Sequence, residues 1–574
     1  MTTKTATKKT TTTNATGPVS TSSTFEKKSK SGKRKRQRNK QVPKPGEEGF
    51  KTPTQLRNAR KRRSKKKQKP ERSPPAGQVG HVGNSPGGQH NIRWASSAGG
   101  KAGVDPSLLY LSDPTSAPVV AKAQRFFQGK KIPFKVHVGP TKGWRTVAKL
   151  AVRASGPNKD LSIGLFAPNS HDLIPVPDCV AHHPSINSSV AVLEHICRQH
   201  GVVPYDEKTG NGQLRHVAIN VERSTGRVQV TLVWNGTKPN STNQRDNGDN
   251  GDEQEEEEGD IASSGLVLDK LVQHLVAVGA AGNPSGGGGR KRRRGRQAKG
   301  DPSGLKDSSS PDNSGNTGPH KQHQGQDGLK LHSLWVHYNS LWKHANAVFN
   351  IEGGKDCWER RFGPTFVEER LEPLDRQEQT VGLRFPPNVF RQANLDAFTK
   401  IVASIRARLL ENRNDRGGDN TKTRKQSCVE LYGGVGTIGL NVADLFGSLV
   451  SSDENPFNKQ CFDAAATASS GLHDVDVSYV SKNAADMVKA GALGTANVAI
   501  MDPPRKGLDE TTLQRLCKSK KPSLLVYVSC GFDAFERDCR TLTSSGWLLE
   551  QAEGHVLFPG SDAIETLAFF VRKP

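Results

Sequence analysis

The chain has 574 residues, of which only 33% are hydrophobic, and its formal net charge is +26. This length allows two or more domains, but the low apolar content indicates that part of the chain does not fold. The sequence has no apolar run of about 18 residues and its eight cysteines form no CxxC motif, so we expect neither a membrane-spanning helix nor a cysteine-built zinc or iron–sulfur site.

The first 105 residues are predicted to be a disordered basic tail. Residues 1–80 contain 24 Lys and Arg against 4 Glu, so about +6 of the net charge remains for the other 494 residues. Segments such as "SGKRKRQRNK" have no apolar periodicity, and their charge favours polyanions through counterion release. We expect RNA or DNA to bind this tail, although a nuclear-import signal or a solvated arm fits the pattern equally well.

Residues 131–234 show the alternation of strands. In "QLRHVAINVERSTGRVQVTLVW", apolar residues alternate on both sides of a turn at Ser224–Gly226, which predicts a hairpin with one buried face. The segment "WRTVAKLAVR" predicts another strand, with Arg145, Lys149 and Arg153 on one side. That cationic side fits either RNA binding or plain solvation. We assign residues 106–235 to the first part of a β-rich central domain.

A low-complexity insertion is predicted at residues 236–328. Nine acids lie between Asp246 and Asp260, an apolar helix-like segment covers Ile261–Ala281, and the basic run "GGGGRKRRRGRQAKG" follows. A compact domain rarely contains a structureless loop of this length, so we expect most of the segment to lie outside the fold. Residues 329–400 then form the second part of the central domain and a linker helix.

From Ser427 onward, strands alternate with helices, which predicts an α/β fold with a parallel, doubly wound sheet in residues 401–574. Two further segments, Trp547–Val556 and Ile564–Val571, leave no room for a helix between them and are expected to pair antiparallel at one end. The expected parallel strands are 427–431, 448–452, 475–480, 496–501 and 524–528.

Three glycines, Gly433, Gly434 and Gly436, separate the first of these strands from a helix expected near Thr437. Such glycines let a ligand lie against the backbone at the carboxyl end of a strand. About 17 residues after the last of them, Asp453 ends the second strand, where a carboxylate can accept hydrogen bonds from ribose hydroxyls. The pair indicates a nucleotide-like cofactor, and dinucleotide enzymes share this arrangement.

The motif "VAIMDPPRKGL" ends the strand 496–501 in Asp502, and its two prolines fix a loop against a planar substrate. Methyltransferases acting on exocyclic amines carry an aromatic residue after Asp-Pro-Pro. Arg505 stands at this position, which argues against amine methylation.

Cys530 follows the strand 524–528, so a doubly wound sheet places it beside the Asp502 loop. A thiolate is a strong nucleophile, and we expect the helix near Asp533 and the Arg505 side chain to lower the thiol pKa. A buried, inert role is the alternative for any cysteine. It suits the cysteines within predicted elements better, namely Cys428, Cys461 and Cys517.

Glu565 lies among apolar residues in "LFPGSDAIETLAFFVRK", at the start of the last strand. Burial of an unpaired carboxylate is costly and raises its pKa toward the range useful for proton transfer. An exposed glutamate on an edge strand is the alternative.

Together these motifs resemble those of the RNA (uracil-5-)-methyltransferase family, which forms 5-methyluridine in transfer and ribosomal RNA. "DPPRKGL", "YVSC" and "LFPGSDAIETLA" occur in the family's order and spacing, and "NVFRQAN", residues 388–394, matches its cofactor-contacting element. The resemblance covers residues 106–235, more weakly, and 329–574. It implies a C-terminal Rossmann-like class I methyltransferase domain with S-adenosylmethionine as cofactor.

The resemblance also implies roles for single residues. Cys530 would attack C6 of a flipped-out uridine, C5 would accept the methyl group, and Glu565 would remove the C5 proton. Base extrusion costs a few kcal/mol, and less in a loop, which favours loops of tRNA or rRNA as substrates. The implied cofactor-binding positions are Gln392, Tyr432, Thr437, Asp453, Asn483 and Asp502.

Four residues at three places depart from the family pattern. The glycine loop has Gly433 where a cysteine is usual, Gly531-Phe532 replaces Asn-Pro after the nucleophile, and Ala563 replaces a common histidine. The second change predicts a differently shaped loop after Cys530.

Two alternative functions remain open. RNA cytosine-5 methyltransferases also attack C6 with a cysteine, but they commonly carry another cysteine at the position of Arg505. A non-catalytic RNA-binding or assembly factor would keep the fold and use the basic arms.

We expect a monomer that binds RNA, without a metal ion or a membrane. The cysteine pattern indicates an intracellular protein. The basic tail favours the nucleus or nucleolus, whereas the Thr- and Ser-rich first 25 residues resemble a transit peptide to a mitochondrion or plastid, so the compartment stays undecided.

Overall fold

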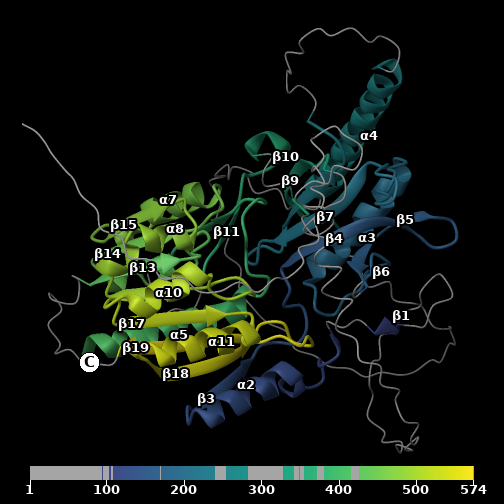
Figure 1. Ribbon diagram of the computed structural model, residues 1–574. Helices are drawn as coiled ribbons and strands as arrows, with labels where there is room; N and C mark the ends of the chain where they lie inside the picture. The colour runs from purple at the N-terminus through teal and green to yellow at the C-terminus, as the bar shows by residue number, and fades with distance from the viewer. Residues whose placement is uncertain are drawn as a thin grey trace, which may run out of the picture. The chain divides into compact units, whose positions relative to one another are not determined.

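The computed structural model describes most of the chain after residue 107 (Figure 1). The described residues are 93–94, 103–104, 108–167, 170–238, 254–281, 328–341, 348–349, 354–371, 380–414 and 426–572, all within one compact unit of residues 89–574. Nearly all of the predicted basic tail lies outside them, apart from β1 (Arg93–Trp94) and β2 (Gly103–Val104), which pair antiparallel. None of the described helices has the length and apolar character needed to cross a membrane.

An eight-stranded sheet forms the core of the C-terminal part, in the order β15-β14-β13-β16-β17-β19-β18-β3. Strand β19 (Glu565–Arg572) runs antiparallel to both β17 and β18 (Trp547–Val556). The predicted parallel sheet with an antiparallel end is therefore confirmed. Its parallel strands are β13 (Ser427–Leu431), β14 (Ser448–Ser452), β15 (Asp476–Val480), β16 (Val498–Met501) and β17 (Leu524–Ser529).

One strand of this sheet comes from far earlier in the chain. Strand β3 (Phe134–Val138) pairs parallel with β18 at the sheet edge, and helix α2 (Pro118–Gly129) precedes it. The rings of Phe127 and Phe134 stack with centroids 4.3 Å apart. Residues 118–138, which the sequence analysis placed in the β-rich domain, instead complete the C-terminal sheet.

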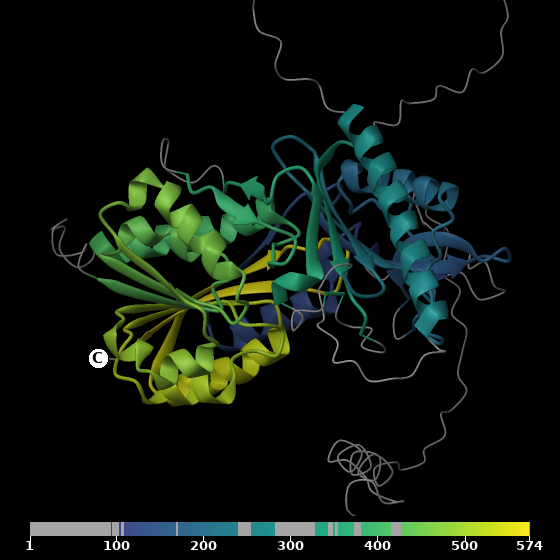
Figure 2. The same ribbon diagram turned by 90° about the horizontal axis from the view of Figure 1, so that it is seen from above.

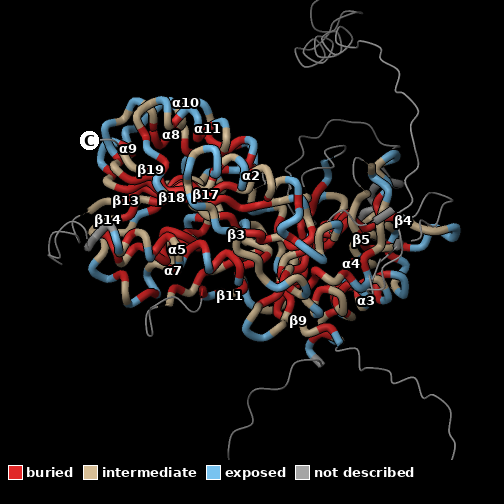
Figure 3. Tube along the Cα trace, turned by 90° about the horizontal axis from the view of Figure 1, so that it is seen from below, coloured by how far each residue is buried: buried red, intermediate tan, exposed pale blue. Residues whose placement is uncertain are grey.

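Helices cover both faces of this sheet (Figure 2). Along β17, Val526 and Val528 point into one core while Leu525 and Tyr527 point into the other, as the two-residue period of a strand requires. Figure 3 shows the buried residues gathered along these strands. The first core contains α5 (Leu395–Asn414) and α7 (Asn458–Ala468); the second contains α2, α8 (Ala484–Lys489), α9 (Ala492–Thr495), α10 (Glu510–Lys518) and α11 (Phe532–Ser544).

The segment after β13 differs from the prediction. In place of a helix near Thr437 it forms two 3-10 turns, η4 (Gly439–Asn441) and η5 (Ala443–Leu445). Gly434 and Gly436 have φ angles of +56° and +84°, which a right-handed helix does not accommodate. The glycines therefore replace the first turns of the helix with an irregular loop.

The β-rich part contains a seven-stranded sheet in the order β10-β9-β8-β7-β4-β5-β6. The predicted hairpin of β7 and β8 is confirmed, but the prediction of one buried face is wrong, because Gln229, Thr231 and Val233 on the other side of β8 are also buried. Strands β11 (Val367–Glu369) and β12 (Leu383–Phe385) form a separate pair. The seven strands are β4 (Val147–Ser155), β5 (Asp160–Phe166), β6 (Leu173–Pro175), β7 (Leu214–Val221), β8 (Val228–Trp234), β9 (Leu331–Tyr338) and β10 (Trp358–Phe362).

Two helices, α3 (Pro184–Gln199) and α4 (Gln254–Ala281), pack on this sheet. Leu271 and Leu275 of α4 are buried in the same core as Leu193 of α3. The expected helix-like segment at 261–281 thus lies in α4, and α4 belongs to the folded β-rich part although the sequence analysis placed it in the insertion. The remainder of that insertion lies mainly outside the described residues.

Of the three cationic residues predicted on one side of β4, Arg153 is buried inside the protein. Its Nη1 donates to the backbone carbonyls of Val152 at 2.7 Å and Arg215 at 2.8 Å. The ammonium of Lys149 lies 4.7 Å from the centroid of the Phe349 ring. Neither the RNA-binding nor the solvated interpretation therefore applies to Arg153.

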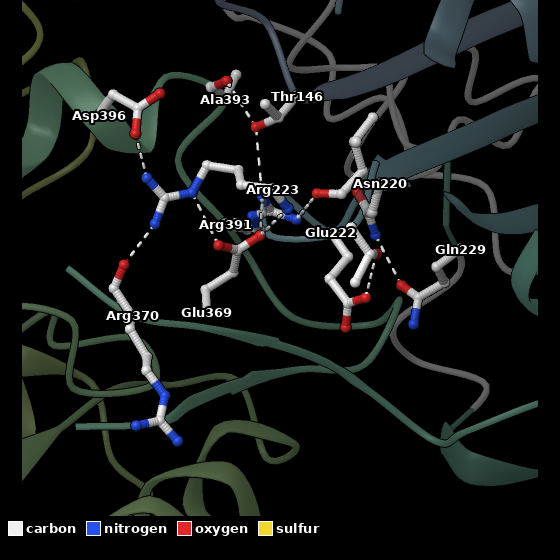
Figure 4. A network of polar contacts seen from close by, with 12 residues as sticks. Thr146, Asn220, Glu222, Arg223, Gln229, Glu369, Arg370, Arg391, Ala393 and Asp396 are labelled. Atoms are coloured by element: carbon white, nitrogen blue, oxygen red, sulfur yellow. Dashed lines mark hydrogen bonds and ion pairs between the residues drawn. The ribbon is translucent and has the colours of Figure 1, made fainter. Parts of the chain in front are cut away.

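A buried ion-pair network joins the β-rich sheet to the segment that precedes α5 (Figure 4). The Arg391 side chain is 2% exposed, and its Nη2 lies 2.6 Å from Oε1 of Glu369. Arg391 also donates to the backbone carbonyl of Val221 at 2.8 Å, and Glu369 accepts from Nε of Arg223 at 2.8 Å. Burial lowers the pKa of Arg391 to about 10, and the Glu369 carboxylate opposes this shift. Arg391 thereby fixes the position of its neighbour Gln392.

We predict that Arg391→Ala lowers the free energy of unfolding by about 3 kcal/mol, because the buried Glu369 carboxylate loses one of its two cations. The control is Arg370→Ala, which removes an exposed ion pair with Glu368 and should cost less than about 1 kcal/mol. Urea unfolding followed by circular dichroism measures both. An equal decrease in the free energy of unfolding of the two variants would contradict the larger contribution that we assign to the buried network.

Candidate active site

The carboxyl ends of three adjacent parallel strands carry the predicted site residues. Tyr432 follows β13, Asp502 follows β16, and Cys530 follows Ser529 at the end of β17. In the sheet register, Leu431 lies beside Met501, and Met501 lies beside Tyr527. The three loops therefore leave the sheet along one edge, where open α/β sheets bind ligands.

Cys530 and Glu565 face each other across the antiparallel pair β17–β19. The last registered pair is Ser529 with Thr566, so Cys530, one residue further along, lies opposite Glu565, the first residue of β19. Cys530 is half-buried and Glu565 is 4% exposed. The structure thus brings the predicted nucleophile and the predicted base together, and Glu565 is not an exposed edge-strand residue.

The thiol of Cys530 differs from the prediction in its acidity. Burial raises its pKa to about 11, and the negative charges of Glu565 and Asp502 add to this, while Arg505 acts in the opposite direction. The expectation that nearby positive groups lower this pKa is therefore wrong. Cys530 is a thiol near neutral pH, and a nucleophilic role would require a base.

Two carboxyl groups beside the thiol have raised pKa values. Burial raises the pKa of Asp502 to about 7, with the charges of Glu430 and Asp453 adding to it. Burial, together with the Asp502 charge, also raises the pKa of Glu565 well above its ordinary value. The Glu565 Oε1 atom has no hydrogen-bond partner among the described residues. A carboxyl group in this state is poised to exchange a proton with a ligand.

Glu430, inside β13, supports the glycine loop and was missed by the sequence analysis. Its Oε1 accepts from the N–H of Gly439 at 2.7 Å, and its Oε2 accepts from Oγ of Ser451 at 2.6 Å. A Cβ on Gly433 would lie 2.7 Å from Oε2 of Glu430, so the loop needs glycine there. Burial raises the pKa of Glu430 to about 7. An acidic residue within the apolar strand "SCVEL" was the available signal.

A pocket beside this loop brings four of the six predicted cofactor residues together, namely Gln392, Tyr432, Thr437 and Asp502. Its wall also includes the backbone of Gly433–Gly434 and the apolar side chains of Phe390, Val435 and Ile438. Tyr432 has a φ of +60°, and its hydroxyl donates to Asp509 at 2.8 Å.

The other two predicted cofactor residues stand outside the pocket wall. Asp453 accepts through Oδ2 from the N–H of Gly434 at 3.2 Å, so it contacts the glycine loop directly. Asn483 caps the N-terminus of α8, where its Oδ1 accepts from the N–H of Asp486 at 2.9 Å. The structure therefore gives Asn483 a capping contact and does not place it at the pocket.

The chemical character of the residues that line this pocket matches the cofactor that the sequence motifs imply. A glycine backbone lets a ligand lie close to the end of β13, while an amide, a hydroxyl and a carboxylate offer both donors and acceptors to a sugar or amino acid. Apolar walls suit an aromatic ring. Gln392, Thr437 and Asp502 are the residues that would hold it.

The loop after Cys530 explains one departure from the family pattern. A Cβ on Gly531 would lie 2.2 Å from the carbonyl oxygen of Arg505, so only glycine permits this contact between the two loops. Phe532 is 3% exposed and packs edge-to-face on Phe126 of α2, with centroids 5.7 Å apart. Gly531 and Phe532 thus seat the nucleophile loop on the Asp502 loop and on the core.

No model of a known protein family matches the chain. The chain is 30% identical over 438 residues to an uncharacterized RNA methyltransferase of Protochlamydia amoebophila, covering 76% of this chain and 88% of that protein. It is 23% identical over 421 residues to an uncharacterized RNA methyltransferase of Leptospira interrogans, covering 73% and 82%.

Among solved structures, the chain resembles the Pyrococcus abyssi tRNA (uracil-54, C5)-methyltransferase in complex with S-adenosyl-L-homocysteine, with 17% identity, a TM-score of 0.49, and coverage of 78% of this chain and 82% of that one. The Protochlamydia relative, in contrast, is 30% identical over 88% of its own length, which is sufficient to assign this chain to the same family. The chain therefore belongs to this family of RNA methyltransferases, as the methyltransferase motifs in its sequence predicted.

Proposed function

We propose that this RNA methyltransferase modifies carbon 5 of a uridine, in a loop of tRNA or rRNA, through a covalent bond between Cys530 and C6. The observation that carries the proposal is the position of Cys530 opposite Glu565 across β17–β19, beside the pocket that contains Asp502. S-adenosylmethionine is the expected cofactor, and when bound it supplies the methyl group from its sulfonium.

The first role of the chain is to generate and direct the nucleophile. Because the Cys530 thiol has a pKa of about 11, its proton must leave as the sulfur attacks. Asp502, with a pKa of about 7, is a carboxylate in part of the population near neutral pH and can accept this proton. The new bond joins Sγ to C6, and the C5–C6 π electrons move to C5, which then bonds to the methyl carbon.

The second role is to release the product. The Glu565 carboxylate removes the remaining C5 proton, the C5–C6 double bond forms again, and the C6–Sγ bond breaks with its electrons on sulfur. A raised pKa makes Glu565 a stronger base than an exposed glutamate once it is ionised. Return of a proton from Asp502 to sulfur restores the thiol.

We predict that Cys530→Ala abolishes methyl transfer, and that Glu565→Gln transfers the methyl group but leaves the RNA covalently attached, because β-elimination lacks its base. Denaturing gels with labelled RNA and S-adenosylmethionine detect both outcomes. Cys517→Ala is the matched control, since Cys517 is also half-buried and stands in the last turn of α10, so it should retain wild-type turnover.

The product distinguishes the proposed function from its two alternatives. Digestion of the methylated RNA to nucleosides should yield 5-methyluridine. A 5-methylcytidine product would instead establish cytosine as the target base. No methylated nucleoside with any RNA of the source cell, despite an intact fold, would favour a non-catalytic RNA-binding factor.

The pH dependence follows from the raised pKa values. We predict that single-turnover methyl transfer slows as the pH falls through about 7, because Asp502 then becomes protonated and no longer accepts the thiol proton. In Asp502→Asn no carboxylate at this position accepts the thiol proton, so the slower remaining reaction should depend on direct ionisation of the Cys530 thiol and have its midpoint at a higher pH than the wild type. An unchanged midpoint would contradict the role of Asp502 as the base.

The contact between the two loops gives a further prediction. Gly531→Ala places a Cβ 2.2 Å from the Arg505 carbonyl oxygen, so the loops must separate and the rate of methyl transfer should fall on the order of 10- to 100-fold. Gly494→Ala is the control, because a Cβ there meets nothing within 4 Å. Similar rates for the two variants would show that the position of the loop does not limit the reaction.

A further inference from the structure

Two histidines and a glutamate converge at the β3 edge of the C-terminal sheet. His137 lies on β3, and Glu553 and His555 lie two residues apart on the neighbouring strand β18. In the parallel register His137 pairs with His555, and residues two apart on a strand share a face. The pairing thus brings together residues that are more than 400 positions apart in the sequence.

The distances between the three side chains match those between the ligands of one metal ion. Oε2 of Glu553 lies 3.5 Å from Nε2 of His137 and 3.3 Å from Nε2 of His555. One ligand atom from each residue lies within 4.8 Å of the others. Tetrahedral coordination with metal–ligand bonds of about 2.0–2.1 Å separates neighbouring ligand atoms by about 3.4 Å.

The ring nitrogens at this cluster lack hydrogen-bond partners. Neither Nδ1 nor Nε2 of His555 has one among the described residues, and neither does Nε2 of His137. His555 is 1% exposed, so bulk water does not solvate these nitrogens. At 3.3 Å, Nε2 of His555 forms an ion pair with Glu553 without ideal hydrogen-bond geometry, and this interaction lowers the pKa of Glu553. The Glu553 carboxylate is therefore the shared partner of both rings, and a metal ion between the three side chains would give the buried nitrogens a ligand bond.

The carboxylate is itself held in place. Oγ of Ser404, on α5, donates to Oε2 of Glu553 at 2.9 Å, and Nε2 of Gln551 donates to Oε1 at 3.4 Å. Such contacts orient a metal-binding carboxylate and are a regular feature of metal sites. The rings of His137 and His555 lie nearly parallel, 12° apart, with centroids separated by 4.7 Å.

We propose that His137, Glu553 and His555 bind one divalent transition-metal ion, with Zn²⁺ as the best match. Two imidazoles and one carboxylate form a donor set that Zn²⁺ uses in proteins, with a water molecule as the fourth ligand. Mg²⁺ and Ca²⁺ prefer oxygen ligands and match the set poorly. The carboxylate offsets half of the charge of the ion.

The ion would fasten β3 to the sheet. Strand β3 lies at the edge, pairs only with β18 within the described sheet, and comes from before the β-rich domain, so a bond to both strands closes a loop of some 400 residues. His555 is also registered opposite Glu565 on β19. The site therefore braces the end of the β18–β19 ladder that presents the catalytic carboxylate.

The test is metal binding by the full-length protein after dialysis against a chelator. Titration with Co²⁺ should give one intense visible absorption band at a 1:1 ratio, without sulfur-to-cobalt charge transfer, and Zn²⁺ should remove the band. Zn²⁺ should also raise the unfolding temperature of the wild type. Binding needs no RNA and no S-adenosylmethionine, so its failure would leave the proposed function intact.

Variants identify the ligands. Glu553→Gln keeps the shape of the side chain, and His137→Ala changes a half-buried residue on an edge strand; each should weaken Co²⁺ binding at least about 10-fold and remove the thermal shift. His473→Ala, an exposed histidine elsewhere, is the control and should bind as the wild type does. Absence of 1:1 binding by the wild type, or unchanged binding by both site variants, would overturn the proposal.

Discussion

The antiparallel pairing of β17 with β19 is the constraint on which the active site depends. It places the residue after one strand opposite the first residue of the other, which brings the sulfur of Cys530 and the carboxylate of Glu565 together although 35 positions separate them. The neighbouring parallel strand β16 adds Asp502 at the same edge. A shift of one residue in this register would turn Glu565 to the other face of the sheet.

Burial of these acids determines the resting state of the site. Burial raises the pKa values of Glu430, Asp502 and Glu565, so they do not all carry charge near neutral pH. Nearby negative charges add to the effect: Asp453 at Glu430, Glu430 and Asp453 at Asp502, and Asp502 at Glu565. Burial, together with the charges of Glu565 and Asp502, also keeps Cys530 protonated near neutral pH. The proposed attack of its sulfur on RNA would therefore require a base that removes the thiol proton.

Much of the C-terminal domain was predictable because its signals are local. Short apolar strands, glycines after β13 and prolines after Asp502 each follow from a few neighbouring residues, and the five parallel strands appeared where the pattern placed them. The pairing of β3 with β18 was not predictable, because nothing in the sequence of residues 134–138 indicates that they pair with residues 552–556.

The wrong predictions about Cys530 and Arg153 also arise from residues that are distant in the sequence. The pKa of Cys530 depends on how deeply Glu565 and Asp502 are buried beside it, which composition does not reveal. The strand pattern predicts that Arg153 faces solvent, but in the structure Glu207 and two backbone carbonyls surround its guanidinium group. The His137, Glu553 and His555 cluster joins residues more than 400 positions apart, so no local motif announces it, and the expectation of no metal stays a prediction.

The most direct test of the central claim is to find the atom that bonds to RNA. RNA with 5-fluorouridine at the target position traps the covalent intermediate after methyl transfer, because Glu565 cannot remove fluorine as a proton. Peptide mapping by mass spectrometry should then locate the methylated fluorouridine adduct on Cys530. An adduct on another residue, or methylation of ordinary uridine without any trapped adduct, would contradict the account.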